Sequence, residues 1–333
     1  MEHRNASCKT YLIIHFHGCS PCPASRPRPG ATELCIHLAH AGSASVLWIA
    51  KDAGIFRKHG LDVNVIYIEG TPKALMSLFA GELQVVAGTG PAVASAKVRG
   101  ADASMIMGFE VFLPYYLIVT PAIKNIEDLK GKVGANHSAA TSADFAMRLG
   151  LRSIGLDPER DVNLRVVGAT NLRMIMMQQG QAQFSVFSIT EREEAEKMGF
   201  RVLADLASKK IPYSHSGVIT SQKMLREKRD AMMRFGRASV EAIHYFKNNK
   251  SQTIAILKKY AKSDLTTLDS AHAYLKNAIP DMPYPTLEGM KTILAEMART
   301  RPEVLKHDPG TMVDRSIVKA IEDEGFLQKL KSN

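Results

Sequence analysis

Cysteine is scarce in this chain of 333 residues, which contains only four. Three of them lie within the first 30 residues, so the remaining sequence contains Cys35 alone. A single thiol cannot form a disulfide within the body of the protein, and none is expected there. We expect Cys35 to lie inside a strand as a small buried hydrophobic residue.

Long apolar runs and dense basic tracts are also missing. Nothing approaches the roughly 18 uninterrupted apolar residues of a membrane-spanning helix, so no transmembrane segment is expected in the body of the protein. The net charge is +10, but basic residues do not alternate with aromatic ones, and nucleic acid is not expected as a partner. With 45% hydrophobic and 23% charged residues, the composition is that of an ordinary globular protein. Its mildly basic character favours anionic solutes.

The motifs of common catalytic and cofactor-binding sites are absent as well. The chain has no GxSxG, no P-loop, no HExxH and no GxGxxG after a strand. His15, His17, Cys19 and Cys22 could bind zinc, but they lie within eight positions of one another. Structural zinc sites separate two ligand pairs by about a dozen residues. We therefore expect no enzyme activity, no cofactor and no metal site.

Residues 1–30 differ in composition from the rest of the chain. They contain four prolines and a short apolar run, Tyr11–Phe16, behind Arg4 and Lys9. This order of charge and apolar core is that of a secretory signal, but the core is short and interrupted by a histidine. Several interpretations stay open for this leader: a degenerate export signal, a wrongly assigned start codon or a disordered tail. A lipoprotein signal at Cys19 fits less well, because His17 and Phe16 precede it instead of small residues.

The stretch Lys132–Leu149 predicts a short strand that runs into a helix through a turn rich in hydroxyl groups. Ser138, Thr141 and Ser142 fall where the N-cap and first turn of that helix would be, with Ser138 as the N-cap. A helix start has unpaired backbone N–H groups and a partial positive charge, so this turn can hold a small anion. His137 stands beside it as a hydrogen-bond donor.

The same strand-turn-helix unit occurs earlier in the chain, with Gly42, Ser43 and Ser45 in its turn. Both copies continue alike: a threonine starts a helix, a glycine follows ten residues later, and a glutamine then precedes an apolar run that ends in a hydroxyl residue. These positions are Thr71, Gly81, Gln84 and Thr89 in one copy and Thr170, Gly180, Gln183 and Ser188 in the other. Chance or ordinary α/β order could produce this agreement, but a structural duplication explains it better. Together with the length, it predicts two similar α/β lobes.

Two segments of the chain resemble a known family. SVLWIAKDAGIFRKHGLDVNVIYIEG, which begins at Ser45, and IEDLKGKVGAN, which begins at Ile126, are similar to the solute-binding proteins of ABC importers for nitrate, sulfonates, taurine and thiamine-pyrimidine precursors. The resemblance covers the chain from about Ala31 to at least Lys247. It implies a type II periplasmic-binding-protein fold, with two α/β lobes joined by two crossing strands and a cleft between them. It also implies a periplasmic or other extracytoplasmic location, a small-molecule solute and a transient membrane permease as partners, and a monomer.

The expected division follows from placing the two crossings. Tyr115–Thr120 is extended and ends at a proline, which suits the first crossing, and Ser214–Thr220 suits the return. Lobe 1 is then expected to comprise residues 31–119 and 217–333, and lobe 2 residues 120–216, after the leader 1–30. From Gln222 onward the pattern is helical, and these helices are expected to pack on lobe 1.

Candidate ligand-binding residues lie at strand ends and helix starts, where open α/β sheets bind small molecules. They are Ser43, Ser45, Thr89, Gly90, Glu110, His137, Ser138, Ala139, Thr141 and Ser188. Arg173 could clamp an anion, although a charged residue in the first turns of a helix is more often solvated.

Departures from the family pattern weaken any assignment of the ligand. Gln84 and Gln183 stand where the family usually has aspartate, and Ala44 stands where pyrimidine-binding members have a histidine, so a pyrimidine is disfavoured. Two rival functions stay open. One is an enzyme of the same fold, in which Glu110 and His137 could form an acid/base pair. The other is a cytosolic small-molecule sensor.

Overall fold

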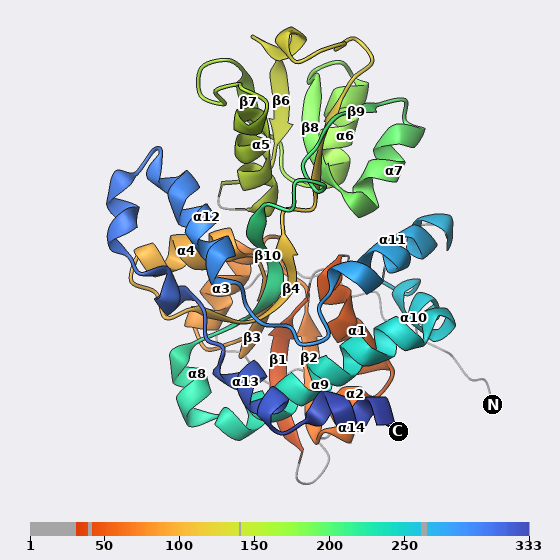
Figure 1. Ribbon diagram of the computed structural model, residues 1–333, viewed down its shortest axis with the longest axis vertical. Helices are drawn as coiled ribbons and strands as arrows, with labels where there is room; N and C mark the ends of the chain where they lie inside the picture. Colours follow the sequence, from red (N-terminus) through yellow and green to blue (C-terminus); the bar gives the residue numbers. More distant parts are fainter. Residues whose placement is uncertain (1–30, 39–41, 140, 261–264, 333) are drawn as a thin grey trace, which may run out of the picture.

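The computed structural model describes residues 31–38, 42–139, 141–260 and 265–332. The leader 1–30, including the metal-site candidates His15, His17, Cys19 and Cys22, lies outside the described residues. The described chain forms two mixed five-stranded sheets, stacked along the long axis of the molecule, with helices packed against each (Figure 1). We call each sheet with its helices a lobe.

The first sheet has the strand order β2-β1-β3-β10-β4. Its strands are β1 (Thr32–His37), β2 (Leu61–Ile66), β3 (Val85–Gly88), β4 (Ser104–Phe112) and β10 (Pro212–Thr220). The first three are parallel, whereas β10 is antiparallel to both of its neighbours. All four residues of β3 are buried, which matches its continuous apolar sequence, as is usual for strands covered on both faces.

The second sheet repeats this pattern in the order β7-β6-β8-β5-β9. Its strands are β5 (Tyr115–Val119), β6 (Val133–Asn136), β7 (Asn163–Val166), β8 (Phe184–Ser188) and β9 (Arg201–Asp205). Again three strands are parallel, and the fourth in the order, β5, runs antiparallel to both neighbours. The expectation that Tyr115–Thr120 is a crossing between lobes was therefore wrong. Because this apolar segment can pair on both edges, it is an interior strand, and the chain changes sheets at 113–114 and again within 206–211.

Helices of the first lobe come from both ends of the described chain. They are α1 (Val46–Asp52), α2 (Ile55–Lys58), α3 (Thr71–Phe79), α4 (Gly90–Val98), α8 (Gln222–Glu227), α9 (Arg229–Asn248), α10 (Lys250–Leu257), α11 (Leu265–Ala278), α12 (Leu287–Ala298), α13 (Ser316–Asp323) and α14 (Phe326–Ser332). As expected, the C-terminal helices pack on this lobe: α9 lies against α1, and α12 against α4 and β10. The apolar face of α9, with Met232, Phe235 and Ile243 buried, explains its position.

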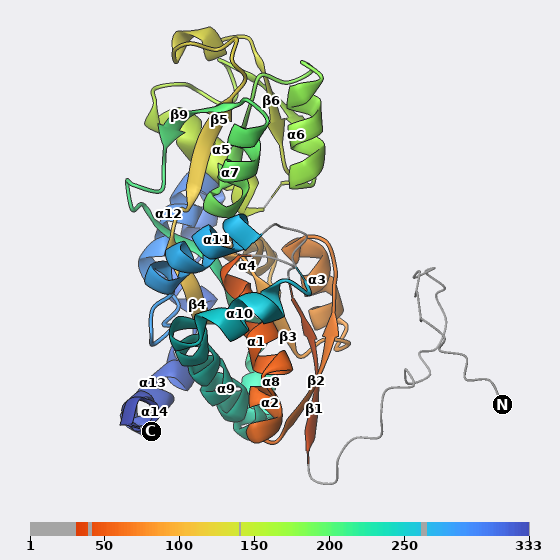
Figure 2. The same cartoon turned by 90° about the vertical axis from the view of Figure 1, so that its right-hand side faces the viewer.

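Helices of the second lobe are α5 (Ser142–Ser153), α6 (Thr170–Gln178) and α7 (Ile189–Lys197). Three of the first lobe's helices reach this lobe: α11 contacts α7 (Figure 2), and both α12 and α4 contact α5. One apolar cluster also continues through both lobes, from Val86 and Met290 to Leu117 and Val186. The lobes are therefore packed together in this conformation.

The duplication extends to individual hydrogen bonds. The side-chain oxygen of Gln84 accepts from the N–H of Cys35 at 2.7 Å, while its amide nitrogen donates to the carbonyl of the glycine three residues earlier at 3.3 Å. Gln183 makes the same two bonds in the second lobe, to the N–H of Val133 at 3.1 Å and to its own turn glycine at 2.9 Å. An aspartate can accept but cannot donate, so glutamine joins the turn to the neighbouring strand in a way that the usual residue cannot.

Candidate functional site

Glu110 on β4 is a buried carboxyl group on the side of the first sheet that faces the second lobe. Its exposed fraction is 5%, and it lies opposite Ser216 of β10. The hydroxyl of Tyr274, from α11, is hydrogen-bonded to Glu110. Burial raises the pKa of Tyr274, and the negative charge of Glu110 raises it further. His215 Nε2 lies 3.8 Å from Glu110 Oε2, which is too long for a hydrogen bond.

His215 joins the two lobes. Its ring packs edge-on against Tyr115 of the second sheet, with centroids 5.3 Å apart, and its backbone oxygen accepts from Ser142 Oγ of α5 at 3.4 Å. Burial lowers the pKa of His215, although Glu110 and Glu191 oppose the shift. Its Nδ1 atom is buried and has no hydrogen-bond partner.

Within the described residues, four hydroxyl groups of the first lobe are likewise buried without a partner, those of Ser45, Thr89, Tyr213 and Thr253. Ser45 and Thr89 are the two among them that the sequence singled out. Ser45 is 4% exposed and ends the short turn Ser43–Ser45, which packs against β4 and β10. Thr89 follows β3 and precedes Gly90, where a Cβ atom would lie 2.5 Å from the Cβ of Ser214. Glycine at this position therefore lets α4 begin directly against β10. The side chain of Ser43 lies outside the described part of the structure.

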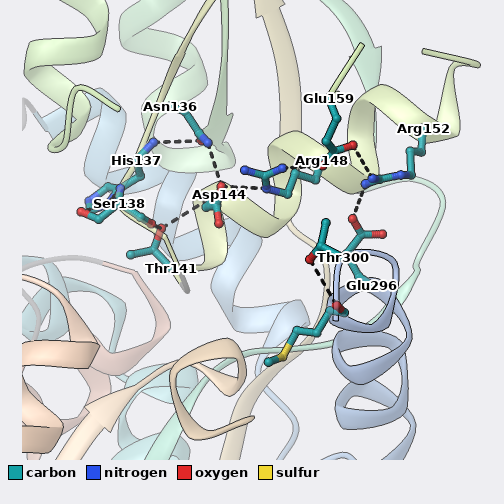
Figure 3. A network of polar contacts seen from close by, with 11 residues as sticks. Asn136, His137, Ser138, Thr141, Asp144, Arg148, Arg152, Glu159, Glu296 and Thr300 are labelled. Carbon is teal, nitrogen blue, oxygen red and sulfur yellow. Dashed lines mark hydrogen bonds and ion pairs between the residues drawn. The ribbon is translucent and has the colours of Figure 1, made fainter. Parts of the chain in front are cut away.

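The helix α5 begins differently from the expectation. Its N-cap is Thr141, whose Oγ1 accepts from Asp144 N at 3.3 Å and donates to Ser138 O at 2.7 Å (Figure 3). Ser138, expected as the N-cap, is exposed and precedes the helix. Both residues carry a hydroxyl. Only that of Thr141 accepts from an N–H group in the first turn of the helix, that of Asp144, so Thr141 is the residue that caps. The only proton of the Thr141 hydroxyl is thus already donated within the protein.

Residues around this helix start make bonds to one another. His137 is half-buried, and its Nδ1 accepts from Ser138 N at 2.7 Å. Burial, followed by the charge of Arg173, lowers the pKa of His137. Ala139 is exposed. Asp144 accepts from Asn136 Nδ2 at 2.8 Å and thereby places a carboxylate in the first turn.

Arg173 is buried, with 1% of its surface exposed, so the alternative of a solvated side chain was wrong. Its guanidinium donates to Ser185 Oγ and Thr170 Oγ1, both at 3.0 Å. Thr170 Oγ1 in turn donates to Glu191 Oε1 at 2.6 Å, which connects the guanidinium to a carboxylate through one hydroxyl. Glu191 also accepts from Ser188 N at 2.8 Å in a capping box at the start of α7, which gives Ser188 a structural role.

A chain of ionic contacts runs from the start of α5 to the first lobe (Figure 3). Arg148 contacts Asp144 and Glu159, and Arg152 contacts Glu159 at 2.7 Å. The other end of the Arg152 guanidinium binds Glu296 of α12, whose side chain is 4% exposed. This ion pair crosses between the lobes.

The structure thus brings together some candidates and separates others. Ser45, Thr89 and Glu110 lie on the first lobe with His215, which the sequence analysis did not single out, and Glu110 has His215 rather than His137 as its imidazole neighbour. The signal for His215 was a histidine within a strand of otherwise small and apolar residues, PYSHSGVIT. Tyr274 carried no signal, because only the tertiary fold brings α11 to this place.

Within the residues that the structure describes, no group of three or more histidine, cysteine or acidic side chains could hold a metal ion. Among the same residues, no helix is both long and apolar enough to span a membrane. Cys35 has a free thiol and is partly buried, and burial raises its pKa, an effect to which Glu33 adds.

Comparison with known proteins gives one family and many structures. The model of a family described as NMT1/THI5 like matches residues 43–253. No curated protein matches the sequence. The alkanesulfonate-binding protein SsuA from Xanthomonas axonopodis pv. citri, solved with bound MOPS, matches with a TM-score of 0.71 and 16% identity over 85% of this chain and 98% of that one. The aliphatic sulphonate binding protein SsuA from Escherichia coli matches with a TM-score of 0.67 and 19% identity over 85% and 92%.

An enzyme shares the same fold. The desulfurization enzyme DSZB matches with a TM-score of 0.69 and 12% identity, over 88% of this chain and 99% of that one. At these identities the matches establish the fold, which is that of type II periplasmic binding proteins.

Proposed function

Because the chain belongs to the NMT1/THI5-like family, we propose that it is the substrate-binding component of an ABC importer and captures a small organic solute between its two lobes. Its likeness in fold to sulfonate-binding proteins supports this function. The partners would be the solute and, transiently, a membrane permease, and the location would be periplasmic or otherwise extracytoplasmic. Fractionation of cells that express the native protein tests the location and separates it from a cytosolic sensor.

The observation that carries the proposal is a set of three on or beside β3 and β10, among the eight buried polar side-chain atoms that have no hydrogen-bond partner within the described residues. These three are Ser45 Oγ, Thr89 Oγ1 and His215 Nδ1. A buried polar atom without a hydrogen bond is costly, and native proteins rarely leave one unpaired without a functional reason. A solute bound between the lobes would supply the missing partners.

Capture would proceed by hinge closure. We infer that the hinges are the two links between the sheets, at 113–114 and within 206–211, and not the crossings expected at Tyr115–Thr120 and Ser214–Thr220. We accordingly propose a first lobe of residues 31–112 and 212–332 and a second lobe of residues 113–211. Periplasmic binding proteins are a standard example of closure around a ligand.

The sequence-based expectation of an anionic solute used the backbone N–H groups, the partial positive charge and the hydroxyl groups at the start of α5, together with the basic net charge. The hydroxyl of Thr141 donates to Ser138 instead, and Asp144 adds a carboxylate to the same turn. The backbone N–H groups of the helix start remain, but the support for an anion at this place is weaker than the sequence indicated.

Two measurements on the same protein test the function. Native mass spectrometry of protein purified without refolding should show a non-covalent small molecule that is lost on denaturation. Small-angle scattering should then show a larger radius of gyration after this molecule has been removed. Protein that carries no small molecule and keeps the same scattering profile in all conditions would contradict the proposal.

An enzyme of this fold is the second candidate, and one observation favours it. The structure places the buried Glu110 carboxyl 3.8 Å from the imidazole of His215, and a carboxyl and an imidazole near each other are common partners in proton transfer. Incubating the released molecule with the protein and analysing it by mass spectrometry distinguishes the two functions, since a binding protein returns the molecule unchanged.

A further inference from the structure

Within the part of the chain that the structure describes, Glu110 has no lysine or arginine as an ion-pair partner. Its side chain is 6% exposed, and a carboxylate in such a place is costly unless a positive charge or several donors accompany it. Tyr274 supplies one neutral hydrogen bond. The two carboxylate oxygens can therefore accept further hydrogen bonds.

His215 does not provide the missing charge. Its Nε2 is 3.8 Å from the carboxylate, and burial disfavours the protonated imidazole more strongly than Glu110 favours it. In the neutral ring, the attraction of Glu110 places the one N–H at Nε2, so Nδ1 is left as an acceptor. This Nδ1 atom is the buried one without a partner. The pair thus presents two acceptors, and the Ser45 hydroxyl, 4% exposed and also unpaired, lies in the turn that packs against the same strands.

The other charged groups near Glu110 do not offset its negative charge. Glu191 acts electrostatically on both His215 and Tyr115 from the second lobe. The guanidinium of Arg173 is connected to Glu191 through Thr170, and its charge acts on Tyr115 in the opposite sense but more weakly than Glu191 does. Glu110 therefore stays uncompensated where the lobes meet.

We propose that the solute carries a protonated nitrogen group, such as an amine or an amidine, and that this group binds to Glu110 while a second N–H donor of the solute binds to His215 Nδ1. The inference rests on the proposed function, because it assigns ligand chemistry to the same site. It reverses the sign expected from sequence for this part of the solute. An acidic group elsewhere on the same solute is compatible with it.

The first test is the composition of the molecule that co-purifies with the protein. Released solute that contains a basic nitrogen supports the inference. Released solute without one overturns the inference and leaves the solute-binding function standing. If no solute is released and neither of the two probes named below binds, both the inference and the proposed function fail.

The second test uses a matched pair of probes, 2-aminoethanesulfonate and 2-hydroxyethanesulfonate, which differ only in the nitrogen group. Calorimetry with the wild-type protein should show tighter binding of the amine. Glu110→Gln keeps the size and the bond to Tyr274 but removes the charge, so it should weaken amine binding by about tenfold to a hundredfold. Equal affinity of the two probes, or an unchanged affinity in Glu110→Gln, would overturn the inference.

Two further variants serve as controls. Glu82→Gln removes an exposed carboxyl from a turn of the first lobe and should leave the affinity for both probes unchanged. Glu110→Asp keeps the charge and should retain part of the preference for the amine. If Glu110→Gln fails to fold, as a lower melting temperature would reveal, the probe preference of the wild type and of Glu110→Asp still decides the question.

Discussion

The ion pair of Arg152 and Glu296 allows a quantitative test of how the lobes are held together. It joins α5 of the second lobe to α12 of the first, and its side chains are 18% and 4% exposed. Burial raises the pKa of Glu296, although Arg152 and Arg299 oppose this shift. The carboxylate is thus the member that burial destabilises, and Arg152 is the residue that offsets this cost.

The two single variants should therefore differ. Arg152→Met leaves a buried carboxylate with only the exposed Arg299, 3.2 Å away, as a counter-charge. Removing one partner of a buried pair costs about 3–5 kcal/mol, and the partial exposure of Arg152 reduces this to about 2 kcal/mol. Glu296→Gln removes the desolvated charge and leaves Arg152 paired with Glu159, so we expect a loss of at most about 1 kcal/mol.

Opening of the lobes relieves this penalty, because Glu296 then becomes solvated. We therefore expect Arg152→Met to shift the open–closed equilibrium rather than to unfold the protein. A change of about 2 kcal/mol alters the ratio of open to closed molecules by about thirtyfold. Small-angle scattering of the ligand-free protein should show a larger radius of gyration for Arg152→Met than for wild type, with little change for Glu296→Gln.

Arg148→Met is the matched control, because Arg148 lies on the same helix and shares Glu159 but has no contact with Glu296 among the described residues. The double variant Arg152→Met/Glu296→Gln should return most of the way to the wild-type profile. If Arg152→Met scatters like Arg148→Met, or if the double variant simply adds the two single effects, the ion pair does not hold the lobes closed.

Three further predictions test separate parts of the structure. Thr141→Ala removes the N-cap of α5 and should lower the free energy of unfolding by about 1 kcal/mol in chemical denaturation, whereas Ser138→Ala should not. Gly90→Ala forces a Cβ against Ser214 and should cost about 1–3 kcal/mol in the same assay, and a neutral result would mean that β10 can move away. Because burial lowers the pKa of His215, the unfolded chain binds a proton that the folded protein does not, so stability should fall as the pH drops from 7 to 5. The melting temperature of His215→Asn should depend less steeply on pH over this range, and an identical slope would mean that His215 is not the group responsible.

Much of the fold could be predicted from local patterns. The helical pattern expected from Gln222 onward is confirmed, for example in the helix Leu287–Ala298, because its apolar spacing and the N-cap Thr286 lie next to each other in sequence. The repeated glycine and glutamine positions likewise predicted two similar units, and the paired bonds of Gln84 and Gln183 provide the physical reason for the repeat. These features depend on interactions within or between neighbouring segments.

What sequence could not predict depends on contacts between distant segments. Ser138 and Thr141 are chemically similar as N-caps, and the path of the backbone decided between them. Tyr115–Val119 reads as an extended link, and only pairing with β8 and β9 makes it an interior strand. Glu110 was a candidate from its position, but its neighbours His215 and Tyr274 come from β10 and α11, far along the chain.

The strand β10, which follows the whole second sheet in sequence but belongs to the first sheet, has a consequence for the order of folding during synthesis. All five strands of the second sheet lie between Tyr115 and Asp205, so this sheet can be completed as soon as that contiguous segment has been made. The first sheet cannot, because β4 pairs with β10 and with no other strand of the described sheet. Until residues 212–220 emerge from the ribosome, the edges of β3 and β4 stay unpaired, which makes the nascent chain prone to aggregation. The half of the protein that is begun first is therefore finished last, and a chaperone that covers these edges would be needed mainly in that interval.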